Sequence, residues 1–255
     1  MIESERDAPA RRPGRVLITG ASRGIGRATA LAFAQHGWLV AAQYHRAEEQ
    51  AQSLAASICS MGGTVALLQA DLAVREDCLR LAQQAQQELG SIDVLVNNCG
   101  IAQQKLFGDI TEEDWDTMFD VNVKSMFRLC HALTPGMIRR HAGKIINLSS
   151  MWGQVGASCE VHYSAAKAAV IGFTKALAKE LGPSGITVNC VAPGVINTDM
   201  NSLLNEETRA ALQEETPLMR LGTPEDVAGT ILFLASHQAD FITGQVICPN
   251  GGFII

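Results

Sequence analysis

The chain is poor in aromatic residues and in charge. Only 5% of its 255 residues are aromatic, just two of them are tyrosines, and 18% are charged. Basic residues are outnumbered by acidic ones, 20 to 26, which gives a net charge of −6. Nucleic acids and anionic membranes attract basic surfaces, so we expect neither to be a partner of this protein.

Long apolar runs and paired cysteines are also lacking. No apolar run approaches the ~20 residues that a membrane helix needs. The seven cysteines are scattered, and none forms a C-x-x-C pair. With no signal-peptide pattern either, we expect a cytoplasmic protein that has neither a disulfide framework nor a metal site.

From Arg15 onward, short apolar runs alternate with longer amphipathic stretches. Near-continuous apolar strands separated by helices indicate a parallel sheet covered on both faces. We therefore predict one α/β domain over residues 15–255, a doubly wound (Rossmann) sheet of seven strands in three layers, preceded by a flexible polar tail at 1–14. The expected strands are 15–19, 38–44, 64–70, 93–97, 144–149, 186–192 and 245–249, and the expected helices lie near 25–36, 47–61, 74–89, 112–140, 162–181 and 224–235.

A glycine-rich turn, TGASRGIG (19–26), follows the first strand and opens the first helix. Gly20, Gly24 and Gly26 stand where a tight strand–helix turn needs residues without side chains. The free N–H groups and the positive end of the helix dipole can then hold a phosphate group. Because the turn also begins a βαβ unit, it predicts dinucleotide binding.

The end of the second strand indicates which dinucleotide is bound. NAD sites usually carry an acid there for the ribose 2′-hydroxyl, but Tyr44, His45 and Arg46 come first and no acid occurs before Glu48. The absence of a carboxylate, with cationic side chains available at the strand end and at Arg23 in the glycine-rich turn, suits a 2′-phosphate. We therefore predict NADP(H). Alternatively, both arginines are only solvated surface residues.

Polar residues also end the third and fourth strands, at the sheet edge where ligands bind in such folds. Asp71 is placed to bind the adenine amino group, or else to cap a helix that starts near Ala73. The segment NNCG (97–100) ends the fourth strand.

These residues resemble the short-chain dehydrogenase/reductase family. The resemblance covers the chain from residue 15 onward and is strongest to 3-oxoacyl-acyl-carrier-protein reductases, including a bacterial subset described as reducing an aminopentanone modification on elongation factor P. The motifs that carry it are TGASRGIG (19–26), Asp71, NNCG (97–100), VNV around Asn122, SS (149–150), YSAAK (163–167) and APGVINTDM (192–200).

The resemblance implies roles for particular residues. Tyr163 would be the general acid/base, Ser150 would hold the carbonyl oxygen, Lys167 would bind the nicotinamide ribose and lower the pKa of the tyrosine, and Asn122 would hold a water in a proton relay. Ser149 competes with Ser150, but the thirteen-residue spacing to the tyrosine favours Ser150. The implied cofactor contacts are Gly20, Ser22, Arg23, Gly24, Ile25, Gly26, Tyr44, His45, Arg46, Asp71, Leu72, Asn98, Gly100, Tyr163, Lys167, Pro193, Gly194, Ile196 and Thr198.

Elementary chemistry supports the Tyr163–Lys167 pair independently. A free phenol has a pKa of ~10, and a cation within ~4–6 Å can shift a neighbouring group by ~1–3 units toward its charged form. Residues four apart share a helix face, and a pKa near the working pH is what acid–base catalysis needs. An ordinary surface pair is the alternative. His162 is expected either to line the pocket wall or to titrate near neutrality.

Several residues depart from the family pattern. Cys99 replaces an alanine, which we expect to be a packing change only. His141 and Ser184 stand where carrier-protein reductases offer basic residues, although Arg139, Arg140 and Lys144 could compensate.

Glu160 falls in the loop expected to line the substrate pocket, beside Met151 and Trp152 as an apolar wall. A carboxylate there would favour a substrate that bears an amine, unless it only faces solvent.

The family resemblance further implies a homotetramer built through the helices near 112–140 and 162–181. It also implies a substrate lid around 199–220, closed by Met200, Leu203 and Leu204. We therefore predict an NADPH-dependent ketone reductase of the 3-oxoacyl thioester type. The alternatives are an aminopentanone reductase acting on elongation factor P and a non-catalytic NADP-binding regulator.

Overall fold

The computed structural model describes residues 13–199 and 205–255. Seven parallel strands form one sheet in the order β3-β2-β1-β4-β5-β6-β7, which confirms the predicted doubly wound fold. The strands are β1 (Arg15–Ile18), β2 (Leu39–Tyr44), β3 (Thr64–Gln69), β4 (Val94–Asn97), β5 (Gly143–Leu148), β6 (Ile186–Val191) and β7 (Val246–Ile247). The order reverses between β1 and β4, the place where such sheets bind ligands beyond their carboxyl ends.

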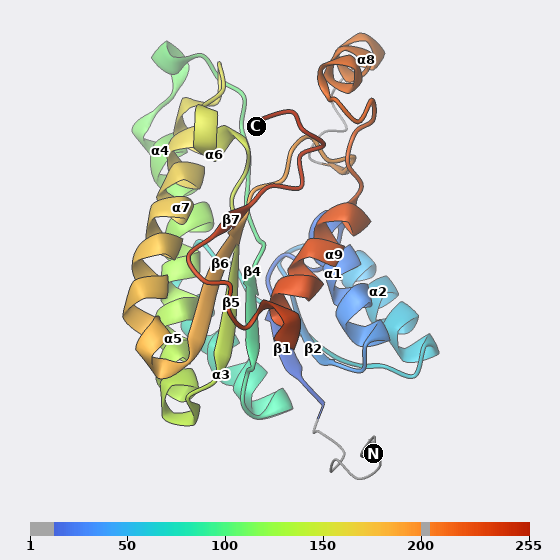
Figure 1. The fold of residues 1–255 in the computed structure, drawn as a ribbon, viewed down its shortest axis with the longest axis vertical. Helices are drawn as coiled ribbons and strands as arrows, with labels where there is room; N and C mark the ends of the chain where they lie inside the picture. Colours follow the sequence, from blue (N-terminus) through green and yellow to red (C-terminus); the bar gives the residue numbers. More distant parts are fainter. Residues whose placement is uncertain (1–12, 200–204) are drawn as a thin grey trace, which may run out of the picture.

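Helices cover both faces of this sheet (Figure 1). Alternate residues of a strand point to opposite faces, so Leu17 enters one core cluster while Val16 and Ile18 enter the other. One layer holds α1 (Gly24–Gln35), α2 (Glu48–Ser60) and α9 (Pro224–Ala235); the other holds α3 (Arg75–Leu89), α5 (Ser125–Arg140) and α7 (Val161–Leu181). The described residues also include short helical segments: η1 (Phe107–Asp109), α6 (Trp152–Val155), η3 (Gly182–Ser184) and η5 (His237–Ala239).

The prediction of a single helix over 112–140 is wrong in one respect. A capping box between Thr111 and Asp114 starts α4 (Glu112–Phe119), but a π-helical turn, η2 (Asp120–Lys124), separates it from α5. A π-turn adds a residue to the helical repeat without breaking the helix, so hydrophobic periodicity does not reveal it. Asn122 lies inside this turn and is buried.

The predicted ends of the domain can be compared only in part. Residues 1–12 of the expected tail lie outside the described residues. The Gly14 carbonyl accepts a hydrogen bond from Leu39 N at 2.8 Å and so extends the pairing of β1 with β2. In the expected lid, α8 spans Glu206–Glu215 with Asn205 as its N-cap. Met200, Leu203 and Leu204 lie outside the described residues. Among the described helices, none is long and apolar enough to cross a membrane.

Candidate active site

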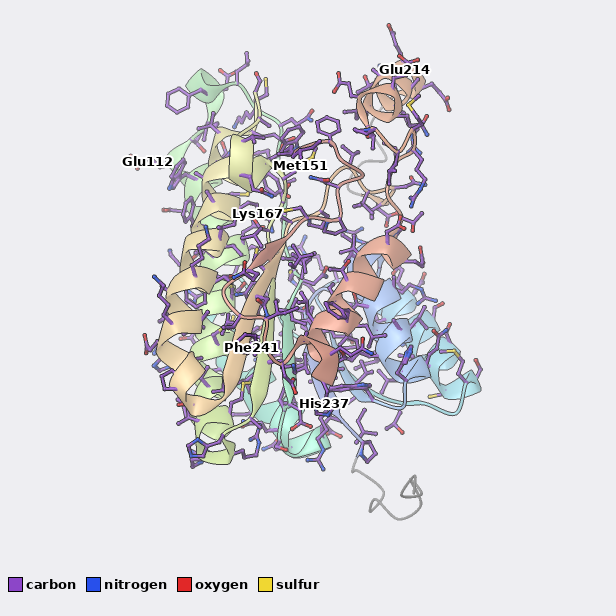
Figure 2. The ribbon with its side chains drawn as sticks, in the orientation of Figure 1. Glu112, Met151, Lys167, Glu214, His237 and Phe241 are labelled. Atoms are coloured by element: carbon purple, nitrogen blue, oxygen red, sulfur yellow. The ribbon has the colours of Figure 1, made fainter. Side chains whose placement is uncertain are left out.

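The predicted site residues gather at the carboxyl edge of the sheet. Figure 2 shows Met151 and Lys167 at this end, well away from Phe241 and His237 at the other. Parallel strands bring their carboxyl ends to one edge, which explains how segments from residue 19 to residue 250 meet here.

The glycine-rich turn between β1 and α1 is tightly packed. Gly20 has a φ of +63°, and a Cβ on Gly26 would lie 2.1 Å from the Gly20 carbonyl oxygen. Neither position accepts a side chain. The Gln43 side chain holds the turn in place: its Oε1 accepts from Gly20 N at 2.7 Å, and its Nε2 donates to the Ala70 carbonyl at 2.8 Å. The sequence analysis did not assign this role to Gln43. A single amide side chain among the apolar residues of β2 could have indicated it.

The end of β4 is tied to the same turn. Asn98 Nδ2 donates to the Thr19 carbonyl at 2.8 Å, and Thr19 Oγ1 accepts from Cys99 N at 2.9 Å. Burial raises the pKa of the Cys99 thiol to about 11. The thiol is therefore protonated at neutral pH, in agreement with the packing role expected for it.

The residues predicted for the adenosine half of a cofactor lie at the ends of β2 and β3. His45 Nε2 is 3.5 Å from Asp71 Oδ2. Asp71 Oδ1 accepts from Ala73 N at 3.0 Å, but α3 begins only at Arg75 with Val74 as its N-cap. The cap interpretation of Asp71 is therefore wrong.

Arg23 lies in the glycine-rich turn with its side chain 68% exposed. One of its Nη atoms is 3.8 Å from a carboxylate oxygen of Asp199. A pair this long and this exposed contributes little, so the guanidinium is free to turn toward an anion.

Asn122 provides a buried acceptor at the centre of the site. Its Nδ2 donates to the carbonyls of Ile101 at 3.1 Å and Met118 at 3.0 Å, while its Oδ1 has no hydrogen-bond partner among the described residues. A Cβ on Gly100 would lie 2.5 Å from that oxygen and 3.1 Å from Lys167 Nζ. The absence of a side chain at Gly100 therefore keeps this space open. Buried polar atoms normally have a hydrogen-bond partner. Asn122 Oδ1 is therefore suited to accept a hydrogen bond from the water that the family resemblance implies.

Tyr163 and Lys167 are both buried on the first turns of α7. Lys167 Nζ donates to the Leu148 carbonyl at 3.0 Å, and burial lowers the pKa of its ammonium to about 8. Burial raises the pKa of the Tyr163 phenol to about 12, opposed by a hydrogen bond with Ser150 and increased by the charge of Glu160. The expectation that Lys167 lowers this pKa is not met in the chain alone, because desolvation dominates and Lys167 points to Leu148.

The two adjacent serines have different partners. Ser149 Oγ donates to the Lys167 carbonyl at 2.8 Å and so ties the end of β5 to α7. Ser150 Oγ accepts from Trp152 N at 3.2 Å and opposes the rise in the pKa of the Tyr163 phenol. Of the two serines, only Ser150 affects the pKa of the phenol.

Glu160 and His162 precede Tyr163 and have different environments. Glu160 is half-buried, accepts from Gln104 Nε2 at 3.3 Å, and has its pKa raised by desolvation. His162 is fully buried, with Nε2 2.9 Å from Gln103 Oε1, and desolvation lowers its pKa. The lowered pKa argues against titration near neutrality, and with no exposed surface His162 is a buried packing residue and does not line the pocket wall. Gln103, which also donates to Asp114 at 3.1 Å, was missed in the sequence analysis.

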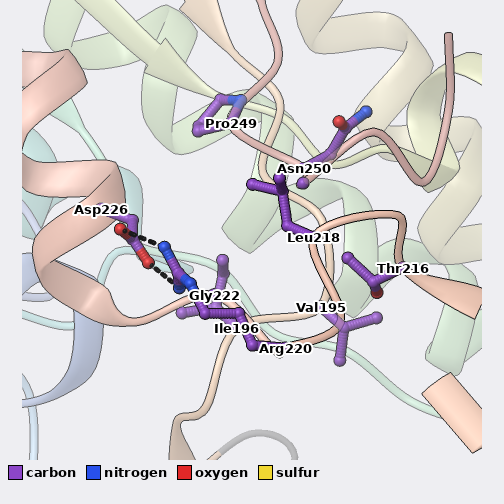
Figure 3. A pocket seen from close by; sticks show the side chains of 10 residues that line it. Val195, Ile196, Thr216, Leu218, Arg220, Gly222, Asp226, Pro249 and Asn250 are labelled. Atoms are coloured by element: carbon purple, nitrogen blue, oxygen red, sulfur yellow. Dashed lines mark hydrogen bonds and ion pairs between the residues drawn. The ribbon is translucent and has the colours of Figure 1, made fainter. Parts of the chain in front are cut away.

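The segment after β6 completes the site. A Cβ on Gly24 would lie 3.4 Å from Thr198 Cγ2, so this segment lies against the glycine-rich turn. Pro193 O accepts from Met151 N at 3.0 Å. A cavity of about 210 Å³ is lined in part by Ile196 and by the Arg220–Asp226 ion pair (Figure 3). Of the remaining predicted contacts, Ser22 and Leu72 are buried beside the turns, and Ile25 packs on the core.

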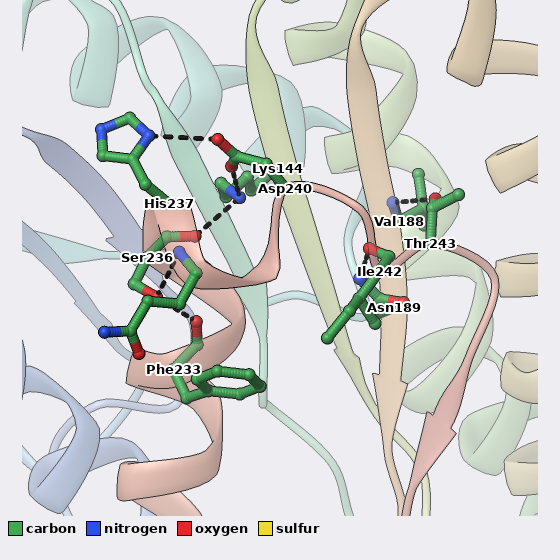
Figure 4. A network of polar contacts seen from close by, with 10 residues as sticks. Lys144, Val188, Asn189, Phe233, Ser236, His237, Asp240, Ile242 and Thr243 are labelled. Atoms are coloured by element: carbon green, nitrogen blue, oxygen red, sulfur yellow. Dashed lines mark hydrogen bonds and ion pairs between the residues drawn. The ribbon is translucent and has the colours of Figure 1, made fainter.

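Two of the basic residues expected to compensate for His141 and Ser184 are already occupied. Lys144 Nζ donates to Asp240 Oδ1 at 2.6 Å and to the Ser236 carbonyl at 2.9 Å (Figure 4). Arg140 donates to the Ile92 carbonyl at 2.7 Å. Both side chains are thus engaged within the chain, which weakens the expectation for Lys144 and Arg140.

Comparisons with known proteins find similar sequences. A family model described as "Enoyl-(Acyl carrier protein) reductase" matches residues 20–254. The 3-oxoacyl-[acyl-carrier-protein] reductase FabG of Staphylococcus aureus (strain Mu50) is 43% identical over 236 residues, covering 92% of this chain and 96% of that protein. A 3-oxoacyl-[acyl-carrier-protein] reductase of Synechocystis is 43% identical over 240 residues, covering 94% and 96%. Nodulation protein G of Rhizobium sp. (strain N33) is 42% identical over 238 residues, covering 93% and 96%.

Proposed function

Since the chain belongs to the short-chain dehydrogenase/reductase family, whose oxidoreductases use a nicotinamide cofactor, we propose that it reduces the ketone of a 3-oxoacyl thioester or a related carbonyl with NADPH. The product is a secondary alcohol, and Tyr163 donates the proton. The observation that carries this proposal is that Ser150, Tyr163 and Lys167 are buried together, with Ser150 acting on the pKa of the phenol and Lys167 Nζ 5.7 Å from the centre of its ring. The names of the Staphylococcus and Synechocystis relatives support the substrate class.

The chemistry follows from these three side chains. A ketone oxygen seated between Ser150 and Tyr163 accepts a hydrogen bond from each hydroxyl, which polarises the carbonyl. NADPH, when bound, supplies the hydride to the carbonyl carbon. Because its pKa is about 12, the phenol holds its proton at neutral pH and transfers it to the oxygen as negative charge develops there.

The tyrosinate left after this step needs a proton and a nearby cation. Lys167 lies next to the phenol and supplies positive charge. Asn122 Oδ1 is a buried acceptor that can hold the water through which the phenol is reprotonated.

The preference for NADPH rests on charge. Arg23 has an exposed guanidinium beside the glycine-rich turn, Arg46 is exposed after β2, and no acid precedes Glu48. Arginine binds phosphate through paired, charge-assisted hydrogen bonds. The 2′-phosphate of NADPH fits this edge better than the free hydroxyl of NADH.

We further propose a cytoplasmic homotetramer assembled through α5 and α7, as the family resemblance implies. Phe127 on the outer face of α5 is 52% exposed, and its ring lies 5.8 Å from that of His131. Covering an exposed aromatic pair of this kind would favour association.

A second candidate is favoured by Glu160. Its carboxylate is half-buried, and its charge reaches Tyr163. A ketone bearing an amine, such as aminopentanone on elongation factor P, would pair with it. A non-catalytic NADP-binding regulator would not need the Ser150–Tyr163 pair at all.

A substrate panel tests the proposal. NADPH oxidation is followed with acetoacetyl thioester, a neutral ketone, an amine-bearing ketone and crotonyl thioester. Turnover of the acetoacetyl thioester supports the leading function, and preference for the amine-bearing ketone supports the second. Turnover of the crotonyl thioester alone would point to carbon–carbon double bonds and contradict both, and no turnover with tight NADPH binding would indicate the regulator.

A further inference from the structure

The carboxyl-terminal residues of the chain end beside α6, at the same end of the molecule as the Ser150–Tyr163 pair (Figure 1). The Phe253 ring meets the Trp152 indole edge-on, with the ring centroids 6.0 Å apart and the planes at 89°. Both side chains are only half-buried. The rings of Trp152 and Phe253 thus meet at a right angle, here called the aromatic corner, and part of their apolar surface remains exposed.

Trp152 connects this corner to the reacting groups. Its backbone N–H donates to Ser150 Oγ at 3.2 Å, and its side chain packs against the cluster of Met118, Tyr163 and Ala166. A ketone whose oxygen sits between Ser150 and Tyr163 therefore has the indole as its neighbour.

The tail that carries Phe253 is held by specific contacts. Asn250 Oδ1 accepts from Gly252 N at 2.9 Å, and Asn250 Nδ2 donates to the Ile254 carbonyl at 2.8 Å. Gly251 and Gly252 have φ values of +66° and +87°, which turn the chain back on itself. Phe253 therefore has a defined place.

Two further contacts fix the tail against the site. Asn250 packs on Gly194, where a Cβ would lie 2.8 Å from the Asn250 Cα. Gln154 Nε2 lies 3.1 Å from Cys248 Sγ, which ties α6 to the end of β7. The aromatic corner is therefore anchored on both sides.

We propose that Phe253 and Trp152 form the wall that receives the apolar chain of the ketone substrate, so that the carboxyl-terminal tail sets the preference for chain length. The inference rests on the proposed reductase function and adds Phe253 as a specificity-determining residue. Partly exposed aromatic surface beside a reacting carbonyl gains free energy when an alkyl chain covers it, and the gain grows with each methylene group.

The test compares Phe253→Ala with Ile255→Ala, a control in the same tail whose side chain is fully exposed. NADPH oxidation is measured with acetoacetyl and 3-oxooctanoyl thioesters of N-acetylcysteamine. We expect Phe253→Ala to lower kcat/KM about tenfold for the longer substrate, mainly through KM, and to leave the shorter one within about twofold. Ile255→Ala should match the wild type with both.

A second variant separates shape from folding. Phe253→Leu keeps apolar volume and should recover most of the activity with the longer thioester. Equal losses with both substrates in Phe253→Ala, or no loss with either, would overturn the role of the tail while leaving the reductase intact. A wild type that turns over neither thioester would instead contradict the proposed function, and the tail proposal with it.

Discussion

Lys167 Nζ lies 5.7 Å from the centroid of the Tyr163 ring, yet its hydrogen bond goes to the Leu148 carbonyl and not to the phenol. The two groups are neighbours through the four-residue spacing on α7. Their pKa values move in directions that burial dictates: Tyr163 rises to about 12 and Lys167 falls to about 8. Both shifts favour the neutral form of the side chain.

The depressed pKa of Lys167 predicts a pH-dependent stability. A group whose folded pKa lies below its unfolded value of ~10.5 contributes fully above that value and loses the contribution as pH falls through about 8. The contribution of Lys167 to the free energy of unfolding should therefore rise by about 2 kcal/mol between pH 8 and pH 10. It is measured as the difference between the wild type and Lys167→Met, both without cofactor, because buried thiols such as Cys99 ionise in the unfolded chain over the same range and lower stability in both proteins. In urea titrations, the difference in stability between the wild type and Lys167→Met should therefore shift by this amount in favour of the wild type as pH rises. Parallel pH profiles for the two proteins would show that burial does not control this lysine.

Gly100 is predicted to be intolerant of a side chain. A Cβ there meets Asn122 Oδ1 at 2.5 Å and Lys167 Nζ at 3.1 Å, so Gly100→Ala must displace one of these groups. We expect a loss of ~1–3 kcal/mol in stability, with a fall in kcat that exceeds the fall in NADPH affinity. Gly108→Ala is the matched control, because no atom lies within 4 Å of its added Cβ. Similar kinetics for both variants would show that the space beside Asn122 is not needed.

Arg23 is predicted to select the cofactor. Arg23→Ala should lower kcat/KM for NADPH about tenfold, the effect of losing one charge-assisted contact, and should leave the value for NADH nearly unchanged. Arg139→Ala, on α5 in the opposite helix layer, serves as the control. If Arg23→Ala lowers kcat/KM equally for NADPH and NADH, the guanidinium does not bind the 2′-phosphate.

Much of this site follows from sequence because it depends on short, ordered motifs. The turn at Gly20–Gly26 and the Tyr163–Lys167 spacing fix local geometry by themselves. Contacts between residues far apart in the chain have no comparable motif in the sequence. Nothing near Phe253 shows that its ring meets Trp152, and nothing near Lys144 shows its bond to Asp240. The desolvation that raises the pKa of Tyr163 likewise comes from packing, which the sequence gives only as a pattern of apolar residues.

Glu160 is predicted to discriminate between charged and neutral ketones. Glu160→Gln keeps the shape and an acceptor oxygen but removes the charge that faces the site. KM should rise about tenfold for an amine-bearing ketone, as expected for losing one partly buried ion pair, and should change little for a neutral ketone. An equal change for both would mean that the carboxylate serves only to hold Gln104.

The central claim is that Tyr163 donates the proton to a ketone reduced by NADPH. The most direct measurement pairs the turnover of Tyr163→Phe with its affinity for NADPH, each compared with the wild type. Because the phenol is the proton donor, its removal should lower kcat by at least ~10²-fold, while NADPH binding by fluorescence stays close to that of the wild type. A Tyr163→Phe enzyme that still reduces the ketone at the wild-type rate would contradict the account.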